Sequence, residues 1–207
     1  MASWWERHGV PRLIKCACSQ GQIMKVRSKV VPHARGHVLE LGCGGGINME
    51  FYRPGQIESF SGLDPSPELL AMSVAAAAAR GIDADIRGGV GEAMPFENGS
   101  FDTVVTTFTL CSVHDQAAVL SEIRRVLKPG GTALFLEHGA APDAGVAKWQ
   151  RRIEPIWKRI GGNCHLTRPI SDAYEKAGFA VDRQAAAYIP KTPRPFGWYE
   201  YGAARPA

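Results

Sequence analysis

The sequence lacks several features that would point to other classes of protein. Its 207 residues contain no uninterrupted apolar stretch of the ~18 residues that span a bilayer. The first eleven residues lack the apolar segment of a cleavable secretory signal. There is also no internal repeat or low-complexity linker. Because the 45% hydrophobic content is ordinary for a chain that forms a substantial core, we expect a soluble globular protein.

The cysteines show no metal-binding or redox spacing. No pair has the CxxC spacing of zinc ribbons or thioredoxin-type proteins, which disfavours both classes. We therefore expect no metal site and reduced thiols, as is typical of a cytoplasmic protein. The five cysteines are Cys16, Cys18, Cys43, Cys111 and Cys164.

The net charge of +4 is concentrated near the N-terminus. Residues 1–36 contain seven lysines and arginines and a single glutamate, a balance of +6, so the rest of the chain sums to −2. This basic leader, which includes Trp4 and Trp5, fits either peripheral contact with an anionic membrane or acidic partner, or a flap over an active site. We favour the flap. No recognition motif accompanies the charge, so we expect no nucleic-acid partner.

Strand and helix patterns alternate from residue 37 onward. Short apolar or β-branched runs predict strands at 38–41, 60–63, 84–87, 102–107 and 132–136. Helices follow Ser66 and Asp115, which are typical N-cap residues, and Lys128-Pro129-Gly130-Gly131 is expected to end the second of these helices. Two last strands, 180–188 and 198–203, follow each other without a helix. The prediction is an α/β fold: a doubly wound, mostly parallel seven-stranded sheet with an antiparallel last strand, formed by residues 37–207.

A helical pattern between residues 149 and 160 combines an apolar stripe with basic residues. We interpret the stripe as core and lid, with a membrane-touching surface as the alternative. We expect Pro155 to kink or restart the helix. The stripe comprises Trp149, Ile153, Ile156, Trp157 and Ile160.

A glycine-rich turn follows the first predicted strand. Gly42, Gly44 and Gly46 would let the backbone turn tightly and approach a ligand that a Cβ would exclude. In open α/β sheets, ligands bind beyond the carboxyl ends of the strands. The dinucleotide fingerprint G-x-G-x-x-G needs glycine where this chain has Ile47, which argues against NAD.

Two acidic residues lie at positions where the ribose and the adenine of a bound nucleoside would be expected. Asp64 ends the second strand, 20 residues after Gly44, and either accepts from both ribose hydroxyls or is a turn carboxylate before Pro65. Glu92, directly after Gly91, either accepts from an adenine amino group or is a surface turn residue.

These segments together resemble the class I S-adenosylmethionine-dependent methyltransferases of the methyltransferase domain 11 type. The motifs are LELGCGGG, GLDPS, GEAMPF, SFDTVV and EIRRVLKPGG. The resemblance implies S-adenosylmethionine as the cofactor. The residues implied to bind it are Glu40, Gly42, Gly44, Gly46, Asp64, Pro65, Gly91, Glu92 and Thr107.

A further set of residues is similar to a narrower group, the methyltransferase-like 7 proteins, which methylate small alkyl thiols and hydrogen sulfide. The set is TLCSV at 109–113, LEH at 136–138 and Cys164 with LTR at 166–168. The similarity implies a small-molecule acceptor, with an alkyl thiol or sulfide the first to test. The alternatives are a phospholipid or quinone methyltransferase at a membrane surface, and a non-catalytic cofactor-binding protein.

Methyl transfer requires an aligned nucleophile and exclusion of water, with no covalent enzyme intermediate. Because a thiol reacts as its thiolate, a nearby base would help. His138, just after the fifth predicted strand, is the candidate catalytic residue, and a histidine that only bonds a loop is the alternative. We interpret Cys111 as part of the pocket wall and Cys164 as a packing residue.

Overall fold

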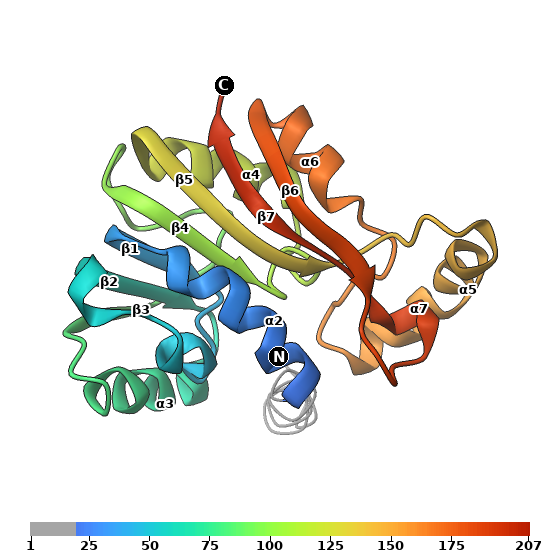
Figure 1. Ribbon diagram of the computed structural model, residues 1–207, viewed down its shortest axis with the longest axis horizontal. Helices are drawn as coiled ribbons and strands as arrows, with labels where there is room; N and C mark the ends of the chain where they lie inside the picture. The colour runs from blue at the N-terminus through green and yellow to red at the C-terminus, as the bar shows by residue number, and fades with distance from the viewer. Residues whose placement is uncertain (1–19) are drawn as a thin grey trace.

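Seven strands form a single sheet in the order β3-β2-β1-β4-β5-β7-β6 (Figure 1). Strands β1 to β5 pair in parallel, and β7 is antiparallel to both β5 and β6. This arrangement confirms the predicted fold. The strands are β1 (Gly36–Leu41), β2 (Ile57–Asp64), β3 (Ala84–Gly88), β4 (Phe101–Thr107), β5 (Leu127–His138), β6 (Phe179–Tyr188) and β7 (Trp198–Pro206).

The computed structural model describes residues 20–207, in which helices cover both faces of the sheet. Trp4, Trp5, Cys16 and Cys18 of the predicted leader lie outside the described residues. Helices α5 and α7 lie together to one side of the sheet (Figure 1). The helices are α2 (Gly21–Val30), α3 (Pro67–Ala78), α4 (Gln116–Val126), α5 (Ala144–Ile160), α6 (Ile170–Lys176) and α7 (Arg194–Gly197). Short 3-10 turns occupy Val31–His33, Ile47–Glu50 and Pro54–Gln56.

Two hydrophobic cores lie on opposite faces of the sheet. Leu39 and Leu41 of β1 join the core that contains residues of α4 and α6, whereas Val38 joins the core that contains residues of α2. The alternation follows from the two-residue period of a strand. The central strands are therefore buried on both faces, as parallel strands require.

Ser66 occupies the N-cap position of α3 as predicted, whereas the predicted end of α4 is wrong. The Ser66 side chain makes no capping bond to α3, because its hydroxyl donates to the Glu68 carboxylate instead; Pro67 still occupies the first turn. Helix α4 already ends at Val126, and the segment Lys128-Pro129-Gly130-Gly131 belongs to β5. Asp115 caps α4 as predicted, because its carboxylate accepts from the backbone N–H groups of residues 117 and 118.

Helix α5 differs from its sequence interpretation. It continues without a break through Pro155, which lacks the N–H that would bond the carbonyl of the exposed Arg151. Trp149, Ile156 and Ile160 are 56%, 66% and 42% exposed, so these residues do not belong to a core. Trp157 does pack, with its ring 4.7 Å from that of Phe196 in α7. Within residues 20–207, no helix is long and apolar enough to cross a membrane.

Candidate active site

A cavity of about 660 Å³ lies at the carboxyl ends of β1, β2 and β4. This is the edge of a parallel sheet at which ligands bind. Eight of the nine predicted cofactor-binding residues line the cavity: Glu40, Gly42, Gly44, Asp64, Pro65, Gly91, Glu92 and Thr107.

Gly46 is the exception, because it does not line the cavity. It has φ +76°, and a Cβ there would lie 2.7 Å from the Cβ of Ala76 in α3, so this glycine permits packing of the loop against the helix. Gly42 has φ +69°, and a Cβ there would overlap Thr109. Gly44, with φ +52°, differs because the nearest atom to its missing Cβ is 4.0 Å away, which leaves space for close approach of a ligand.

A buried hydrogen-bonded network forms one wall of the cavity. Glu40 accepts from the Tyr52 hydroxyl at 2.9 Å and from the Asn48 amide at 2.8 Å. Arg27 donates to the Asn48 Oδ1 and Thr107 Oγ1 atoms, both at 2.7 Å. Burial raises the pKa of Glu40 to about 7, although its hydrogen bonds and the Arg27 charge act in the opposite direction. A cationic ligand group beside Glu40 would favour the ionised carboxylate.

Arg27 was not predicted as a site residue. It belongs to α2, within the basic leader, and it is 4% exposed although it lines the cavity. Its Nε atom is buried and has no hydrogen-bond partner among the described residues. Its guanidinium also lies 5.3 Å from the centre of the Phe108 ring. An anionic ligand group at this wall would satisfy the unpaired donor.

Asp64 connects the two loops at the ends of β1 and β2. Its Oδ2 atom accepts from the Gly44 N–H and its Oδ1 atom from the Ser66 N–H, both at 2.9 Å. Burial raises the pKa of Asp64, and these two backbone bonds lower it. Each carboxylate oxygen retains a second lone pair for a ligand hydroxyl. The residue therefore has the turn role that the sequence suggested and lines the cavity as well.

Glu92 lies at the cavity margin and fixes a neighbouring loop. Its Oε1 atom accepts from the His114 N–H at 2.8 Å and from the Asp115 N–H at 3.1 Å. The carboxylate is thus more than a surface turn residue, because it anchors the start of α4. The other carboxylate oxygen is the atom that we assign to an adenine amino group as a hypothesis.

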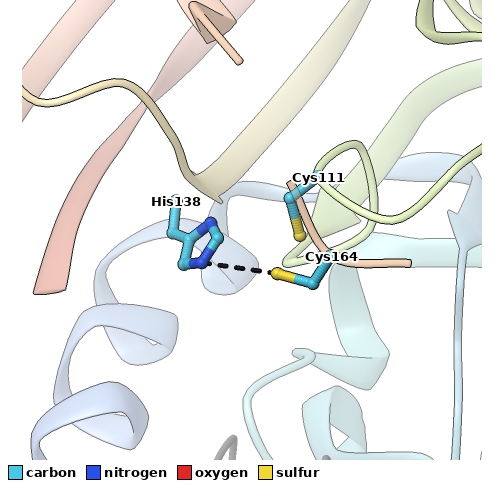
Figure 2. A group of neighbouring side chains, drawn as sticks. All are labelled: Cys111, His138 and Cys164. Carbon is cyan, nitrogen blue, oxygen red and sulfur yellow. Dashed lines mark hydrogen bonds between the residues drawn. The ribbon is translucent and has the colours of Figure 1, made fainter. Parts of the chain in front are cut away.

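Cys111, His138 and Cys164 form a separate cluster beside the cavity (Figure 2). They come from the loop after β4, the end of β5 and the loop after α5. The Cys164 Sγ atom lies 3.4 Å from the His138 Nε2 atom. His138 does not line the cavity, but Ser112 and Asn163, the sequence neighbours of the two cysteines, do. The cluster therefore lies behind the cavity wall, and its two cysteines are adjacent in the chain to the lining residues Ser112 and Asn163.

Hydrogen bonds join the two loops that carry the cysteines. Asn163 donates its side-chain amide to the Ser112 carbonyl at 2.9 Å, and the His165 N–H donates to the Cys111 carbonyl at 2.8 Å. Arg168 donates to the carbonyls of Leu110 and Val113. These bonds fix the positions of the two thiols relative to each other.

The cluster has unusual electrostatics. The hydrogen bond between Cys111 and Cys164, together with burial, raises the pKa of the Cys111 thiol well above the ordinary value. Burial alone would lower the pKa of His138, but the neighbouring Cys111 and Glu137 outweigh it and the pKa is raised. Burial raises the pKa of Glu137 to about 7, and its Oε1 atom accepts from the Thr109 N–H at 3.1 Å.

Known proteins resemble this chain in sequence and in fold. Residues 39–135 match the Methyltransferase domain family. The chain is 41% identical over 170 residues to thiol S-methyltransferase TMT1B of Rattus norvegicus and 35% identical over 153 residues to thiol S-methyltransferase TMT1A of Homo sapiens. These alignments cover 80% and 72% of this chain, but 66% and 62% of the relatives. The chain therefore spans just under two thirds of their length.

This chain belongs to the class I S-adenosylmethionine-dependent methyltransferases. The fold agrees: a putative methyltransferase of Haloferax volcanii, solved with the Trm112 methyltransferase activator, superposes with a TM-score of 0.70 at 22% identity. That superposition covers 98% of this chain and 96% of the other.

The cavity of this methyltransferase fits S-adenosylmethionine. The unpaired Nε atom of Arg27 suits the carboxylate of the amino-acid moiety, and the Glu40 carboxylate suits its ammonium group. The open space at Gly44 permits close approach to the loop, and Asp64 offers acceptors for ribose hydroxyls. Sequence reasoning missed several lining residues, among them Arg27, Thr109, Ser112 and Asn163. Thr109 and Ser112 belong to the TLCSV segment, which the sequence did not assign to the cofactor cavity, whereas Arg27 and Asn163 lie outside every motif quoted above.

Proposed function

We propose that this methyltransferase transfers the methyl group of S-adenosylmethionine to a small alkyl thiol or to hydrogen sulfide. The observation that carries the proposal is the Cys111–His138–Cys164 cluster directly behind Ser112 and Asn163 of the cavity wall. A soft, polarizable surrounding of this kind suits a sulfur nucleophile. The 41% identity to a thiol S-methyltransferase supports the same acceptor class.

The cofactor supplies a methyl group that its sulfonium already activates. The task of the chain is to orient it and to exclude water. Arg27 and Glu40 would hold the amino-acid end, Asp64 the ribose, and Glu92 would lie near the adenine. This assignment leaves the end of the cavity beside Ser112 and Asn163 for the acceptor.

The acceptor has to lose a proton, because the thiolate is the reactive form. His138 is the group in the cluster that can take up a proton near neutral pH. The Arg168 guanidinium interacts electrostatically with both cysteines, and it contributes a positive charge that favours a thiolate nearby. Together these residues would lower the cost of forming the nucleophile.

The test is a turnover screen with methyl-labelled S-adenosylmethionine against thiols, sulfide, amines, phenols and lipids. Thiol turnover should exceed that of amines and phenols, and it should rise between about pH 7 and 9 as thiolate accumulates. A panel with no methylated thiol, beside efficient turnover of an amine or a lipid, would contradict the proposal.

A second candidate, methylation of a lipid or quinone at a membrane surface, is favoured by helix α5. The exposed Trp149, Ile156 and Ile160 lie on one side of this helix. Basic side chains border this strip along one edge, at Lys148, Arg152 and Arg159, whereas Arg151 and Lys158 lie on the opposite side of the helix. An apolar strip bordered by positive charge is complementary to an anionic bilayer. Within residues 20–207, this surface is suited to peripheral membrane contact, and the predicted contact of the leader through Trp4 and Trp5 stays a prediction.

Vesicle co-sedimentation separates the two candidates. The protein should bind phosphatidylserine-containing vesicles more tightly than pure phosphatidylcholine vesicles, and Trp149→Ser/Ile156→Ser should weaken that binding. Val74→Ser, at a residue of α3 that is 50% exposed, is the matched control. Methylation of an amphiphile only when vesicles are present would favour the second candidate over the soluble thiol.

A further inference from the structure

Three soft ligand atoms meet in the Cys111–His138–Cys164 cluster (Figure 2). The two Sγ atoms and a ring nitrogen of His138 all lie within 4.8 Å of one another, and Cys164 Sγ is 3.4 Å from His138 Nε2. A tetrahedral Zn²⁺ with ordinary Zn–S and Zn–N bonds separates such atoms by about 3.5–3.8 Å. Small rotations of the side chains would therefore bring all three into coordination.

The surroundings of the cluster suit a dication. Cys111 is 2% exposed and neighbours a second thiol, an arrangement that opposes ionisation of either sulfur unless a cation lies between them. Two thiolates and a neutral imidazole would together balance the charge of one divalent ion. The charge of Arg168 would then be available to offset one additional thiolate.

The cluster leaves one coordination position without a protein ligand. Among residues 20–207, no fourth histidine, cysteine, aspartate or glutamate joins the group. Three protein ligands and one open position are typical of a catalytic zinc site, and two cysteines with one histidine are a known ligand set for it. None of the three cluster residues lines the cavity, but their neighbours Ser112 and Asn163 do, so the acceptor sulfur would have to reach the open position between these two loops.

We propose that Cys111, His138 and Cys164 bind a soft divalent metal ion, Zn²⁺ in the cell, whose fourth coordination position binds the sulfur of the acceptor. The identity of this fourth ligand rests on the proposed thiol methylation, whereas metal binding by the three residues does not. Thiolate and imidazole ligands select zinc over magnesium or calcium, which prefer oxygen.

The reaction balances without any further reagent. The acceptor thiol releases its proton to solvent as it binds the metal. The metal thus takes over the role that the proposed function gives to His138 as a base, and His138 acts as a ligand instead. A lone pair of the thiolate forms the new S–CH₃ bond, while the S–CH₃ bond of the sulfonium breaks and its electron pair stays on the sulfur of S-adenosylhomocysteine. The thioether product is neutral and binds zinc more weakly than a thiolate, so it can leave.

Metal content tests the site independently of activity. The full chain, purified from zinc-supplemented medium, should contain one zinc per molecule by elemental mass spectrometry. Cys111→Ser and Cys164→Ser should each weaken zinc affinity by about 100-fold or more in a chelator competition, since even groups behind the ligands contribute 10–100-fold. Cys43→Ala and Cys16→Ser/Cys18→Ser are the matched controls, and both should keep the zinc.

Cobalt substitution tests the ligand set. The Co²⁺ form should show sulfur-to-cobalt charge transfer in the near ultraviolet, which should fall by about half in Cys164→Ser because one of two thiolates is lost. Addition of methanethiol should increase the band, because a third sulfur joins the metal. Calorimetry with S-adenosylhomocysteine shows whether each variant remains folded.

The outcomes separate this inference from the proposed function. Zinc bound with no thiol methylated would support the metal site and contradict the thiol acceptor. Thiol methylation at the full rate by zinc-free protein would overturn the binding of the acceptor sulfur to the metal and leave the proposed function standing. A folded protein that binds no zinc, or that carries a Cys111–Cys164 disulfide by mass spectrometry and takes up no zinc after reduction, would overturn the metal site.

Discussion

The Arg27 guanidinium donates a 2.7 Å hydrogen bond to the Thr107 hydroxyl, which joins helix α2 to the carboxyl end of β4. Thr107 also accepts from the Asn48 amide at 2.9 Å, so the bond belongs to the network that holds Glu40. A residue of the basic leader is thereby built into the cavity wall.

Arg27→Ala should weaken S-adenosylmethionine binding. Hydrogen bonds to a charged group contribute about 1.5–3 kcal/mol, which corresponds to a loss of affinity of about 10- to 150-fold. Arg27→Lys should restore part of the affinity because it keeps the charge. Lys29→Ala, an exposed position on the same helix, is the control and should bind normally. Calorimetric titration measures all three, and equal affinity in Arg27→Ala and the parent would contradict this assignment.

The cavity could be predicted largely from the sequence, because its signals are local. Gly42 and Gly44 directly follow a strand, and Asp64 ends the next one, so topology alone brings them to the same edge of the sheet. Gly46 belongs to the same motif but faces α3, and only the packing of that helix distinguishes it from its neighbours.

The rest of the site could not be predicted, because it depends on contacts between distant segments. Nothing in the leader distinguishes Arg27 from its other basic residues until α2 crosses the sheet and buries it. Cys111 and Cys164 lie far outside any CxxC spacing, so the expectation of no metal site followed from spacing alone. Arg168 and Asn163 bring these cysteines together through hydrogen bonds that no sequence pattern reveals.

Asp64→Asn should weaken cofactor binding by about 10- to 100-fold, because the variant loses the charge that strengthens bonds to ribose hydroxyls. Asp64→Ala should lose about 30- to 1,000-fold. The alanine variant should also melt at a lower temperature, because the N–H groups of Gly44 and Ser66 lose their acceptor. Calorimetry and thermal melting check both effects, with the exposed Asp83→Ala as control. A loss of cofactor affinity of less than threefold in a folded Asp64→Ala variant would contradict the assignment of Asp64 to the ribose hydroxyls.

Stability should depend on pH through the two buried glutamates. Burial raises the pKa of both Glu40 and Glu137 to about 7. Between about pH 4.5 and 7 the folded state thus retains protons that the unfolded chain has lost, so the free energy of unfolding should fall as the pH rises and level off above 7. Each group can contribute at most about 3 kcal/mol to this fall.

Urea denaturation across this pH range measures the effect. Glu40→Gln and Glu137→Gln should each flatten part of the profile, because an amide does not titrate. Glu97→Gln, at an exposed position, should leave the profile unchanged. A profile that rises from pH 5 to 7, or one that neither buried variant alters, would show that these carboxyl groups ionise normally in the folded protein.

Arg168→Lys should impair use of the acceptor while leaving cofactor binding nearly unchanged. The guanidinium bonds two carbonyls at once, those of Leu110 and Val113, and a lysine ammonium cannot reproduce that planar geometry. Loss of one such bond should loosen the loop that carries Cys111, and we expect the acceptor KM to rise about 10-fold. Because Arg168 bonds neither Asp64 nor Arg27, the Kd for S-adenosylmethionine should stay within about twofold of the parent value. Arg151→Lys, on the exposed side of α5, is the control. Steady-state kinetics measures the acceptor KM of both variants, and calorimetry measures their affinity for S-adenosylmethionine. Weaker cofactor binding with an unchanged acceptor KM would place these loops beside the cofactor instead.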